Sequence, residues 1–431
     1  MFSSGKLKHI IIALLFLALL APLGLGGQSA EAQIGADTPI LLVVNDSVPY
    51  QFGRYLGDIL TAEGLNSFIT IQIGALTAAD LTGRDLVILA ETALTPGQAT
   101  LISSYVTSGG RLLAMRPDPQ IAGLFGLGTT AGTRNSAYLR IINGAVVNGS
   151  APGLGLTSET MQYKGLATQY NTQPGAVTLA QLYSNATTST SFPAVVGTSD
   201  GRAVAFTYDL ARSVIFMRQG NPANANIDTD GDGVLRTIDL WQTGGISSWV
   251  DLNKVPVPQV DEQQRLFARL VKQAVESVRP LPQMWYFPGT AKTVLVATGD
   301  AHANPLSWYQ NLINRMNTYN GDITVYVSIG QLDNAEVQNW ISQGHDFGIH
   351  PYAYRPDSYE PFNIESLAEG YYVYDNWFSM QFTSPKSPTV RNHQVAWLGW
   401  TDAAELARSY GIRLDTNFYH GGPWLQKPYG T

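Results

Sequence analysis

Short apolar runs alternate with amphipathic helical patterns in two separate stretches of this sequence, residue 38 to about residue 125 and residues 293–418. Such runs are typical of buried strands, and the order strand, helix, strand favours a parallel sheet with helices on both faces. In the first stretch the predicted strands are 40–45, 66–72, 86–90 and 111–115, and the predicted helices are 50–63 and 95–108. The pattern therefore places the chain in the α/β class.

The second stretch is the more regular of the two. Its predicted strands are 293–297, 323–329, 346–349, 389–392 and 413–418, and its predicted helices are 305–316, 334–342, 364–380 and 402–410. A closed barrel needs more strands, and an open sheet edge leaves backbone groups unpaired. We therefore expect an incomplete (β/α) barrel, and we expect the sequence to be a fragment that ends inside its last domain.

Between these stretches, residues 135–220 change character. Short apolar runs at 138–142, 194–197, 203–208 and 213–217 read as strands separated by turn residues, and Ser-Asp-Gly at 199–201 predicts a hairpin. This β-rich section is either an insertion in the first domain or its continuation. A long helix is expected at 260–278, and the following RPLP predicts a boundary. The predicted domains are therefore 33–280 and 281–431, since 431 residues exceed one ordinary domain.

The N-terminus predicts the compartment. Lys6 and Lys8 precede an apolar run at 10–20, and Ala-Glu-Ala at 30–32 is a cleavage signal, so residues 1–32 are predicted to be a secretory signal peptide. The alternative is an uncleaved anchor, although the apolar core is short for a span. The chain has no cysteine, which favours a secreted bacterial protein with a large core and excludes thiol nucleophiles and Cys-ligated zinc.

The charge pattern limits the partners. The net charge is −7, and no run of Lys and Arg occurs outside the N-terminus. Nucleic acid is therefore not an expected partner. No later stretch is long and apolar enough to suggest a membrane span after cleavage of the signal peptide.

Histidines follow the predicted strands of the last domain. His350 ends the strand 346–349, and His393 ends the strand 389–392. Active sites of α/β barrels form at such strand ends, so both are candidate metal ligands. His393 could instead be a buried histidine that a neighbour satisfies. His345 lies at the opposite end of its strand, about 16 Å from His350 if extended, and is expected to be a structural turn residue.

Asp300 and His302 follow the strand predicted at 293–297. Asp300 could be a general base, a metal ligand or the cap of the helix near residue 305. His302 belongs either to the site or to a surface loop. Asp415, in the last predicted strand, could orient a ligand or the substrate. The aromatic residues Tyr352, Tyr354, Trp397, Trp400 and Trp424 could stack on a sugar or simply pack.

The last 150 residues resemble the polysaccharide deacetylases of the NodB homology type. TGDAH at 298–302 is similar to the first motif of that family, and GHDFGIH at 344–350 is similar to the sequence leading into its second motif. The resemblance implies a distorted β/α barrel and a divalent metal, usually zinc. It implies that Asp300 is the catalytic base and His350 the first metal histidine. His302 and His393 would replace the ligands lost at Ala301 and Tyr354.

The resemblance also assigns substrate-binding residues. Arg391 stands in the region of the third motif and Asp415 in that of the fourth. Tyr352 and Trp397 are candidate sugar-binding residues from their aromatic side chains alone. The implied function is a secreted, metal-dependent carbohydrate deacetylase, a hydrolase of C–N or ester bonds in a polysaccharide. Because the ligand set departs from the family pattern, a non-catalytic glycan-binding protein is an alternative. A different metal hydrolase on the same barrel, such as an amidase, is another.

The first domain resembles the flavodoxin-like or class I glutamine amidotransferase-like fold over roughly residues 38–220. The family's nucleophile is a cysteine, and this chain has none. Amidotransferase activity is therefore excluded, and a binding or scaffolding role remains.

An acidic loop lies between the two domains. Asp228, Asp230, Asp232 and Asp239 occupy positions 1, 3, 5 and 12 of a calcium-binding loop of the EF-hand type, and Gly233 occupies position 6. Position 12 is usually a bidentate Glu, and no helix is expected before the loop. Calcium binding and a plain surface turn therefore both remain open.

Overall fold

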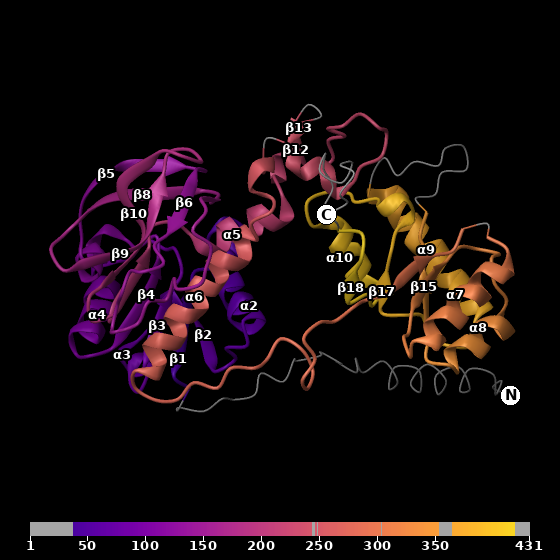
Figure 1. The fold of residues 1–431 in the computed structure, drawn as a ribbon, viewed down its shortest axis with the longest axis horizontal. Helices are drawn as coiled ribbons and strands as arrows, with labels where there is room; N and C mark the ends of the chain where they lie inside the picture. Colours follow the sequence, from indigo (N-terminus) through magenta and orange to yellow (C-terminus); the bar gives the residue numbers. More distant parts are fainter. Residues whose placement is uncertain (1–37, 244–245, 248, 303, 353–363, 419–431) are drawn as a thin grey trace, which may run out of the picture.

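The protein has a mixed α/β architecture, seen here in a computed structural model that describes residues 38–418 except 244–245, 248, 303 and 353–363 (Figure 1). Figure 1 shows an N-terminal body, coloured indigo to magenta, beside a smaller C-terminal body in orange and yellow. The predicted signal peptide, Tyr354 and Trp424 lie outside the described residues. No helix among the residues described is both long and apolar enough to cross a membrane.

A nine-stranded sheet forms the N-terminal body, in the order β2-β1-β3-β4-β11-β10-β9-β6-β7. The first five strands in this order pair in parallel, and the rest pair antiparallel. The strands are β1 (Ile40–Val44), β2 (Phe68–Gln72), β3 (Leu86–Leu89), β4 (Arg111–Met115), β6 (Tyr138–Ile141), β7 (Met161–Gln162), β9 (Ala176–Tyr183), β10 (Ser189–Thr198) and β11 (Ala203–Phe206). The expected hairpin joins β10 to β11, where Gly201 has a φ of 67°.

The β-rich section continues this sheet and is not an insertion, because β11 pairs directly with β4. Only β5 (Leu127–Asn135) and β8 (Leu166–Thr172) form a separate antiparallel pair within it. Of the two possibilities that the sequence left open, an insertion and a continuation of the first domain, the strand pairing agrees with the continuation; the pattern of turns shows short strands but not which sheet they join.

Helices cover both faces of the large sheet because the residues of its central strands alternate between two cores. In β1, Ile40, Leu42 and Val44 face one core, while Leu41 and Val43 face the other. The first core includes residues of α2 (Tyr55–Ala62), α5 (Leu210–Gln219) and α6 (Gln259–Glu276); the second includes residues of α3 (Ala78–Leu81), α4 (Pro96–Thr107) and η3 (Pro119–Phe125). Burial on both faces explains why these strands read as continuous apolar runs.

Several local predictions were wrong. The run 213–217, expected as a strand, lies in α5, whose N-terminus is capped by the Asp209 carboxylate accepting from the backbone N–H groups of Ala211 and Arg212. The helix expected at 50–63 begins as η1 (Pro49–Arg54), a 3-10 segment followed by α2. Residues 293–297 form no strand, and Leu295 is 88% exposed.

The C-terminal body contains a parallel sheet of β14 (Thr298–Asp300), β15 (Thr324–Val327) and β16 (Asp346–Ile349). A second parallel pair consists of β17 (Thr389–Val390) and β18 (Leu414–Asp415). Its helices are α7 (Leu306–Thr318), α8 (Asn334–Ile341), α9 (Ile364–Gln381) and α10 (Asp402–Ser409). The described strands thus form two small sheets, and they do not close a barrel.

Residues 220–258, called here the connection, leave the N-terminal body after α5, return to it at α6 and are drawn between the two bodies in Figure 1. The connection holds short elements, which are η4 (Pro222–Asn224), η5 (Thr237–Trp241), β12 (Gln242–Thr243), β13 (Ile246–Ser247) and η6 (Leu252–Lys254). This segment includes the acidic loop. The aromatic ring of Trp241 lies 5.2 Å from that of Phe418, so the connection packs on the C-terminal body.

Candidate metal centre

The polar residues of the site follow parallel strands at their carboxyl ends. Asp300 is the last residue of β14, His302 comes two residues later, and His350 directly follows β16. His393 begins the short 3-10 segment η7 (His393–Val395), three residues after β17. Parallel strands place such residues at one edge of the sheet, so residues distant in the sequence meet there.

Three imidazole rings stand in a nearly equilateral triangle. The ring centroids of His302 and His350 are 5.1 Å apart, those of His302 and His393 are 5.4 Å apart, and those of His350 and His393 are 5.6 Å apart. The three residues that were predicted separately as ligands are therefore brought together. His350 is buried, His393 is partly buried and His302 is exposed, so the cluster opens to solvent on the His302 side.

Asp300 joins this cluster. One ligand atom each from Asp300, His302 and His350 lies within 4.8 Å of the others. Two atoms that bind one zinc ion at about 2.0–2.2 Å are at most about 4.4 Å apart. Separations within 4.8 Å are compatible with one shared ion, and the donor set of imidazole nitrogen and carboxylate oxygen suits zinc; His393 lies outside this closest group.

His350 has an unused, buried ring nitrogen. Its Nδ1 lies 2.8 Å from the backbone oxygen of Arg391, so this nitrogen carries the proton and donates. Its Nε2 is buried and has no hydrogen-bond partner among the described residues. Burial lowers the pKa of His350 to about 4, so the ring is neutral near pH 7. A metal-binding histidine commonly has this arrangement, with one nitrogen fixed by a carbonyl and the other free to bind.

His393 is held against an aromatic ring. Its imidazole stacks on Tyr352 with a centroid separation of 3.7 Å and an interplanar angle of 11°. The hydroxyl of Tyr352 lies 3.3 Å from Nδ1 of His302, so one tyrosine contacts two histidines. Burial, followed by the charges of His350 and His302, lowers the pKa of His393 to about 4. This ring is therefore also neutral near pH 7.

Arg391 fixes the carboxylate of Asp300. Its Nη1 donates to Asp300 Oδ1 at 3.2 Å, and its Nη2 donates to Thr298 Oγ1 at 2.6 Å. Its Nε donates to Thr416 Oγ1 at 3.3 Å, and the guanidinium lies over the ring of Tyr326. With its nitrogens engaged by the protein, Arg391 orients Asp300 rather than presenting a free cation.

Trp397, Asp415 and His345 have surroundings of their own. Trp397 is 5% exposed and packs edge-on against Phe418 in the core. Asp415, on β18, accepts hydrogen bonds from the backbone and side chain of Asn417, and burial raises its pKa. His345 is buried at the other end of β16, where its Nε2 contacts Asn317 Oδ1 at 3.0 Å, as a turn residue would.

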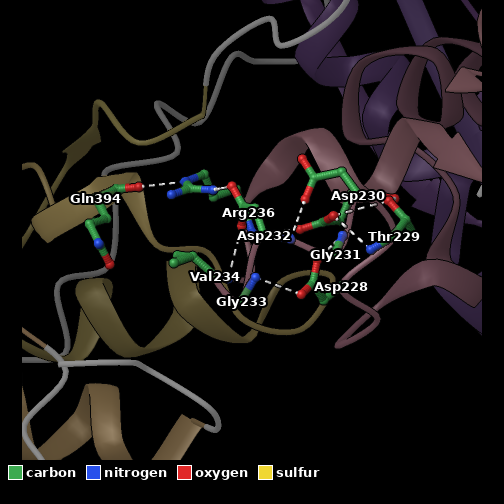
Figure 2. Close-up of polar contacts among 10 residues, drawn as sticks. Asp228, Thr229, Asp230, Gly231, Asp232, Gly233, Val234, Arg236 and Gln394 are labelled. Atoms are coloured by element: carbon green, nitrogen blue, oxygen red, sulfur yellow. Dashed lines mark hydrogen bonds and ion pairs between the residues drawn. The ribbon is translucent and has the colours of Figure 1, made fainter. Parts of the chain in front are cut away.

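The acidic loop forms a compact turn in the connection (Figure 2). Ligand oxygens of Asp228, Asp230 and Asp232 lie within 4.8 Å of one another, and all three residues are exposed. Asp239, at position 12, is 2% exposed and accepts from the backbone N–H groups of Thr229 and Arg236. Exposed acidic turns are common without an ion, so calcium binding stays a prediction.

Sequence reasoning missed the residues that support the site. Asn392 is fully buried, accepts from the hydroxyl of Tyr371 at 2.9 Å and donates to the backbone oxygen of Ala396 at 2.9 Å. Arg236 reaches the same segment from 158 positions away in the sequence. No periodicity or motif marks either residue. The one sequence signal for such a supporting residue is a polar residue next to a candidate ligand, and this signal marks Asn392 but not Arg236.

No protein family model and no curated protein matches this sequence. Among solved structures, the chain is similar to the α-L-fucosidase isoenzyme 2 of Paenibacillus thiaminolyticus, with 12% identity and a TM-score of 0.32 over 41% of this chain and 29% of that one. It is also similar to a GMP synthase subunit of Thermoplasma acidophilum, with 10% identity and a TM-score of 0.34 over 56% of this chain and 96% of that one. Likenesses this weak carry no argument about function.

Proposed function

We propose that this protein is a metal-dependent hydrolase that removes acetyl groups from a polysaccharide. The observation that carries the proposal is the cluster of three imidazoles and the Asp300 carboxylate at the carboxyl ends of parallel strands. The buried and unpartnered Nε2 of His350 supports it further, because a buried acceptor without a partner is costly unless a ligand occupies it.

His350 and His393, with Asp300 or His302, would hold the metal, and zinc suits these donors. Zinc bound there would polarise an acetyl carbonyl and lower the pKa of a bound water. The chain prepares the ligands in two ways. The Arg391 carbonyl fixes the tautomer of His350, and the Tyr352 ring fixes the plane of His393.

Asp300, where it is not itself a ligand, would accept the proton of the attacking water. Arg391, which also donates to Thr298 Oγ1, holds this carboxylate in place. In the reaction the water oxygen bonds to the acetyl carbon, the C–N or C–O bond breaks, and the leaving amine or alkoxide takes a proton. Acetate and the free sugar are the products.

The fold and the compartment expected from the sequence agree with this function. The C-terminal body would be part of a deacetylase-like β/α barrel, and the N-terminal body would be an amidotransferase-like scaffold without its cysteine. The protein would be secreted, where a polysaccharide substrate is accessible. Tyr352, beside two of the histidines, would contact the sugar next to the acetyl group.

The test is zinc content and acetate release in the His350→Ala variant. We expect zinc affinity to fall at least ~100-fold, since loss of an outer-shell partner alone costs about 10–100-fold. Acetate release from chitooligosaccharides, acetylated xylan or peptidoglycan fragments should disappear with it. His345→Gln is the matched control, because that histidine lies at the far end of β16. Unchanged zinc affinity in His350→Ala would refute the assignment.

A glycan-binding protein without catalysis is the second candidate. Ala301 is fully buried where the resembling family has a metal-binding Asp, and this observation favours it. Oligosaccharide binding by calorimetry, without acetate release in the presence of zinc, would support binding alone. Release of acetate that stops on chelation would support the hydrolase.

Calcium at the acidic loop remains part of the proposed cofactors. Asp228, Asp230 and Asp232 provide the oxygens, and calcium prefers oxygen ligands. A calcium titration of the wild-type chain and of Asp230→Asn tests it. Equal heats for both would remove calcium from the proposal.

A further inference from the structure

The turn that carries His393 is conformationally unfavourable. Gln394 and Val395, the two residues after it, have φ values of 58° and 52°. L-residues rarely adopt this left-handed region, and a β-branched valine is especially disfavoured there. Surrounding contacts must therefore hold the turn in place.

Part of the support comes from within the C-terminal body. Asn392 donates from its side chain to the backbone oxygen of Ala396 at 2.9 Å and thereby closes the turn. The backbone N–H of His393 donates to the oxygen of Pro351 at 2.8 Å. These contacts fix both ends of the turn, but they leave the carbonyl of Gln394, at its centre, unbound.

Arg236 supplies that missing contact from the connection. Its Nε donates to the backbone oxygen of Gln394 at 2.9 Å, as Figure 2 shows. Arg236 also forms an antiparallel bridge with Ala396, and the backbone N–H of Trp397 donates to the oxygen of Leu235 at 2.9 Å. A short two-stranded contact therefore runs alongside the residues that follow His393.

Arg236 is itself held at two points. Its Nη1 forms an ion pair with the carboxylate of Asp232 (Figure 2). Its backbone N–H donates at 2.8 Å to Oδ2 of Asp239, which is buried. The Arg236 side chain is only 18% exposed. The guanidinium is bound at both its Nε and its Nη1, so it can hold the carbonyl that it contacts in a fixed place. A solvated guanidinium cannot do so.

We propose that Arg236 is a positioning residue for the candidate metal centre, acting on His393 through the carbonyl of Gln394. This inference rests on the proposed function, since it assigns His393 as a ligand. Arg236 touches neither a substrate nor the three imidazoles. It holds the left-handed turn that presents the His393 ring, in the way that outer residues orient the ligands of a metal site.

The experiment compares Co²⁺ affinity of the full chain in the wild type, Arg236→Ala and Arg236→Lys. We expect Arg236→Ala to weaken binding about tenfold, and Arg236→Lys to recover part of the loss by donating one hydrogen bond. The matched control is Arg218→Ala, which removes another arginine paired with an aspartate, 2.7 Å from Asp261. Adding Arg236→Ala to His393→Ala should cause no further loss, because the positioned ligand is already gone.

A second readout uses the metal-free chain. The ring ¹⁵N signals of His393, measured by NMR, should shift in Arg236→Ala and stay in place in Arg218→Ala. If the wild type takes up no Co²⁺, the proposed function fails, and these signals still decide the positioning role. An unmoved His393 signal, unchanged Co²⁺ affinity in Arg236→Ala, or an equal further loss in the His393→Ala background would overturn it.

Discussion

The two bodies both place polar residues at the carboxyl ends of their parallel strands, but the groups differ in kind. In the N-terminal body the charges pair with one another. Glu91 pairs with Arg116 and with Arg212, and Nε of Arg212 also lies 3.8 Å from Oδ2 of Asp209. In the C-terminal body three neutral or exposed imidazoles meet, and the buried Nε2 of His350 has no partner among the described residues.

This difference separates a structural network from a candidate binding site. Partly buried charges that neutralise each other can exist without a ligand. A buried acceptor with no donor is costly unless a ligand binds to it. Among the described residues, the groups with the spacing of metal ligands lie in the acidic loop and the C-terminal body. The position of a residue at a strand end is therefore not enough to assign a site. At His350 a buried nitrogen without a partner coincides with the spacing of metal ligands, and this combination marks the candidate site.

The largest loss of stability in the charge network of the N-terminal body is expected for Glu91→Ala. Two arginines would lose their carboxylate, and their side chains are 25% and 30% exposed. Breaking a fully buried pair costs about 3–5 kcal/mol, and we reduce this to about 2 kcal/mol for the partial exposure. Urea unfolding would measure the loss.

Glu159→Ala is the control for Glu91→Ala, because Glu159 is 62% exposed in its pair with Lys254 and should contribute about 0–1 kcal/mol. If both variants lose the same free energy of unfolding, the charge network of the N-terminal body has no special structural role.

The second test uses pH, since the two bodies should respond in opposite directions. Burial and the charge of Glu91 raise the pKa of Asp209 from 3.8 to about 7. Its contribution to stability is therefore fully present below pH 3.8 and is lost as the pH rises to about 7. His350 and His393 have pKa values lowered from 6.5 to about 4, so their contribution is present above pH 6.5 and is lost as the pH falls to about 4.

Hydrogen exchange at pH 4.5 and pH 6.5 would resolve these opposite trends within one chain. Amides of β11 should be better protected at the lower pH and those of β16 at the higher pH, by on the order of 1 kcal/mol each. Asp209→Asn should remove the trend in β11 and leave that in β16. Parallel trends in both strands would contradict the assignment.

A smaller effect is expected for Tyr352→Ala. The stacking of Tyr352 on His393 should contribute about 0.5–1.5 kcal/mol. Loss of this contact should weaken Co²⁺ binding up to about tenfold, which titration would measure. Tyr352→Phe keeps the ring and should retain most of the affinity. Equal losses in the two variants would assign the effect to the hydroxyl beside His302 instead.

The smallest effect is expected for Val395→Gly. Relief of the left-handed conformation gains about 1–2 kcal/mol for an L-residue, while glycine costs about 0.5–1 kcal/mol in chain entropy. The free energy of unfolding should therefore rise by about 0–1.5 kcal/mol, which urea unfolding would measure. A large loss would show that the valine side chain, and not its backbone, matters.

Strands and helices could be predicted from the sequence where the buried residues recur with a clear period. The predictions for β4 and β16 match the observed bounds, that for α4 differs by one residue at each end, and that for α9 differs by one residue at its C-terminal end. The error at 213–217 arose because a short apolar run fits both a strand and a buried helix, and the capping role of Asp209 decided for the helix. Strand β8 is rich in polar residues, and the apolar residues of β9 are interrupted by Thr178 and Gln181, so neither gave a continuous apolar run.

For the site, the sequence predicted the convergence of Asp300, His302, His350 and His393 because strand ends have a fixed geometry. It could not predict the stack of Tyr352 on His393 or the reach of Arg236, because both depend on packing between segments far apart in the chain. Trp397 showed the opposite problem, since an aromatic residue suited to sugar binding is buried against Phe418. Composition says which groups exist, and the tertiary structure determines which of them solvent can reach.

The contact between Arg236 and Gln394 affects how the molecule can be divided. A boundary near residue 280 fits the sequence. A fragment of residues 281–431 would nevertheless lack Arg236, which holds the turn after His393. The candidate metal centre therefore depends on a contact from outside the C-terminal body. A fragment has to include residues 220–258 to keep the hydrogen bond from Arg236 to the turn after His393.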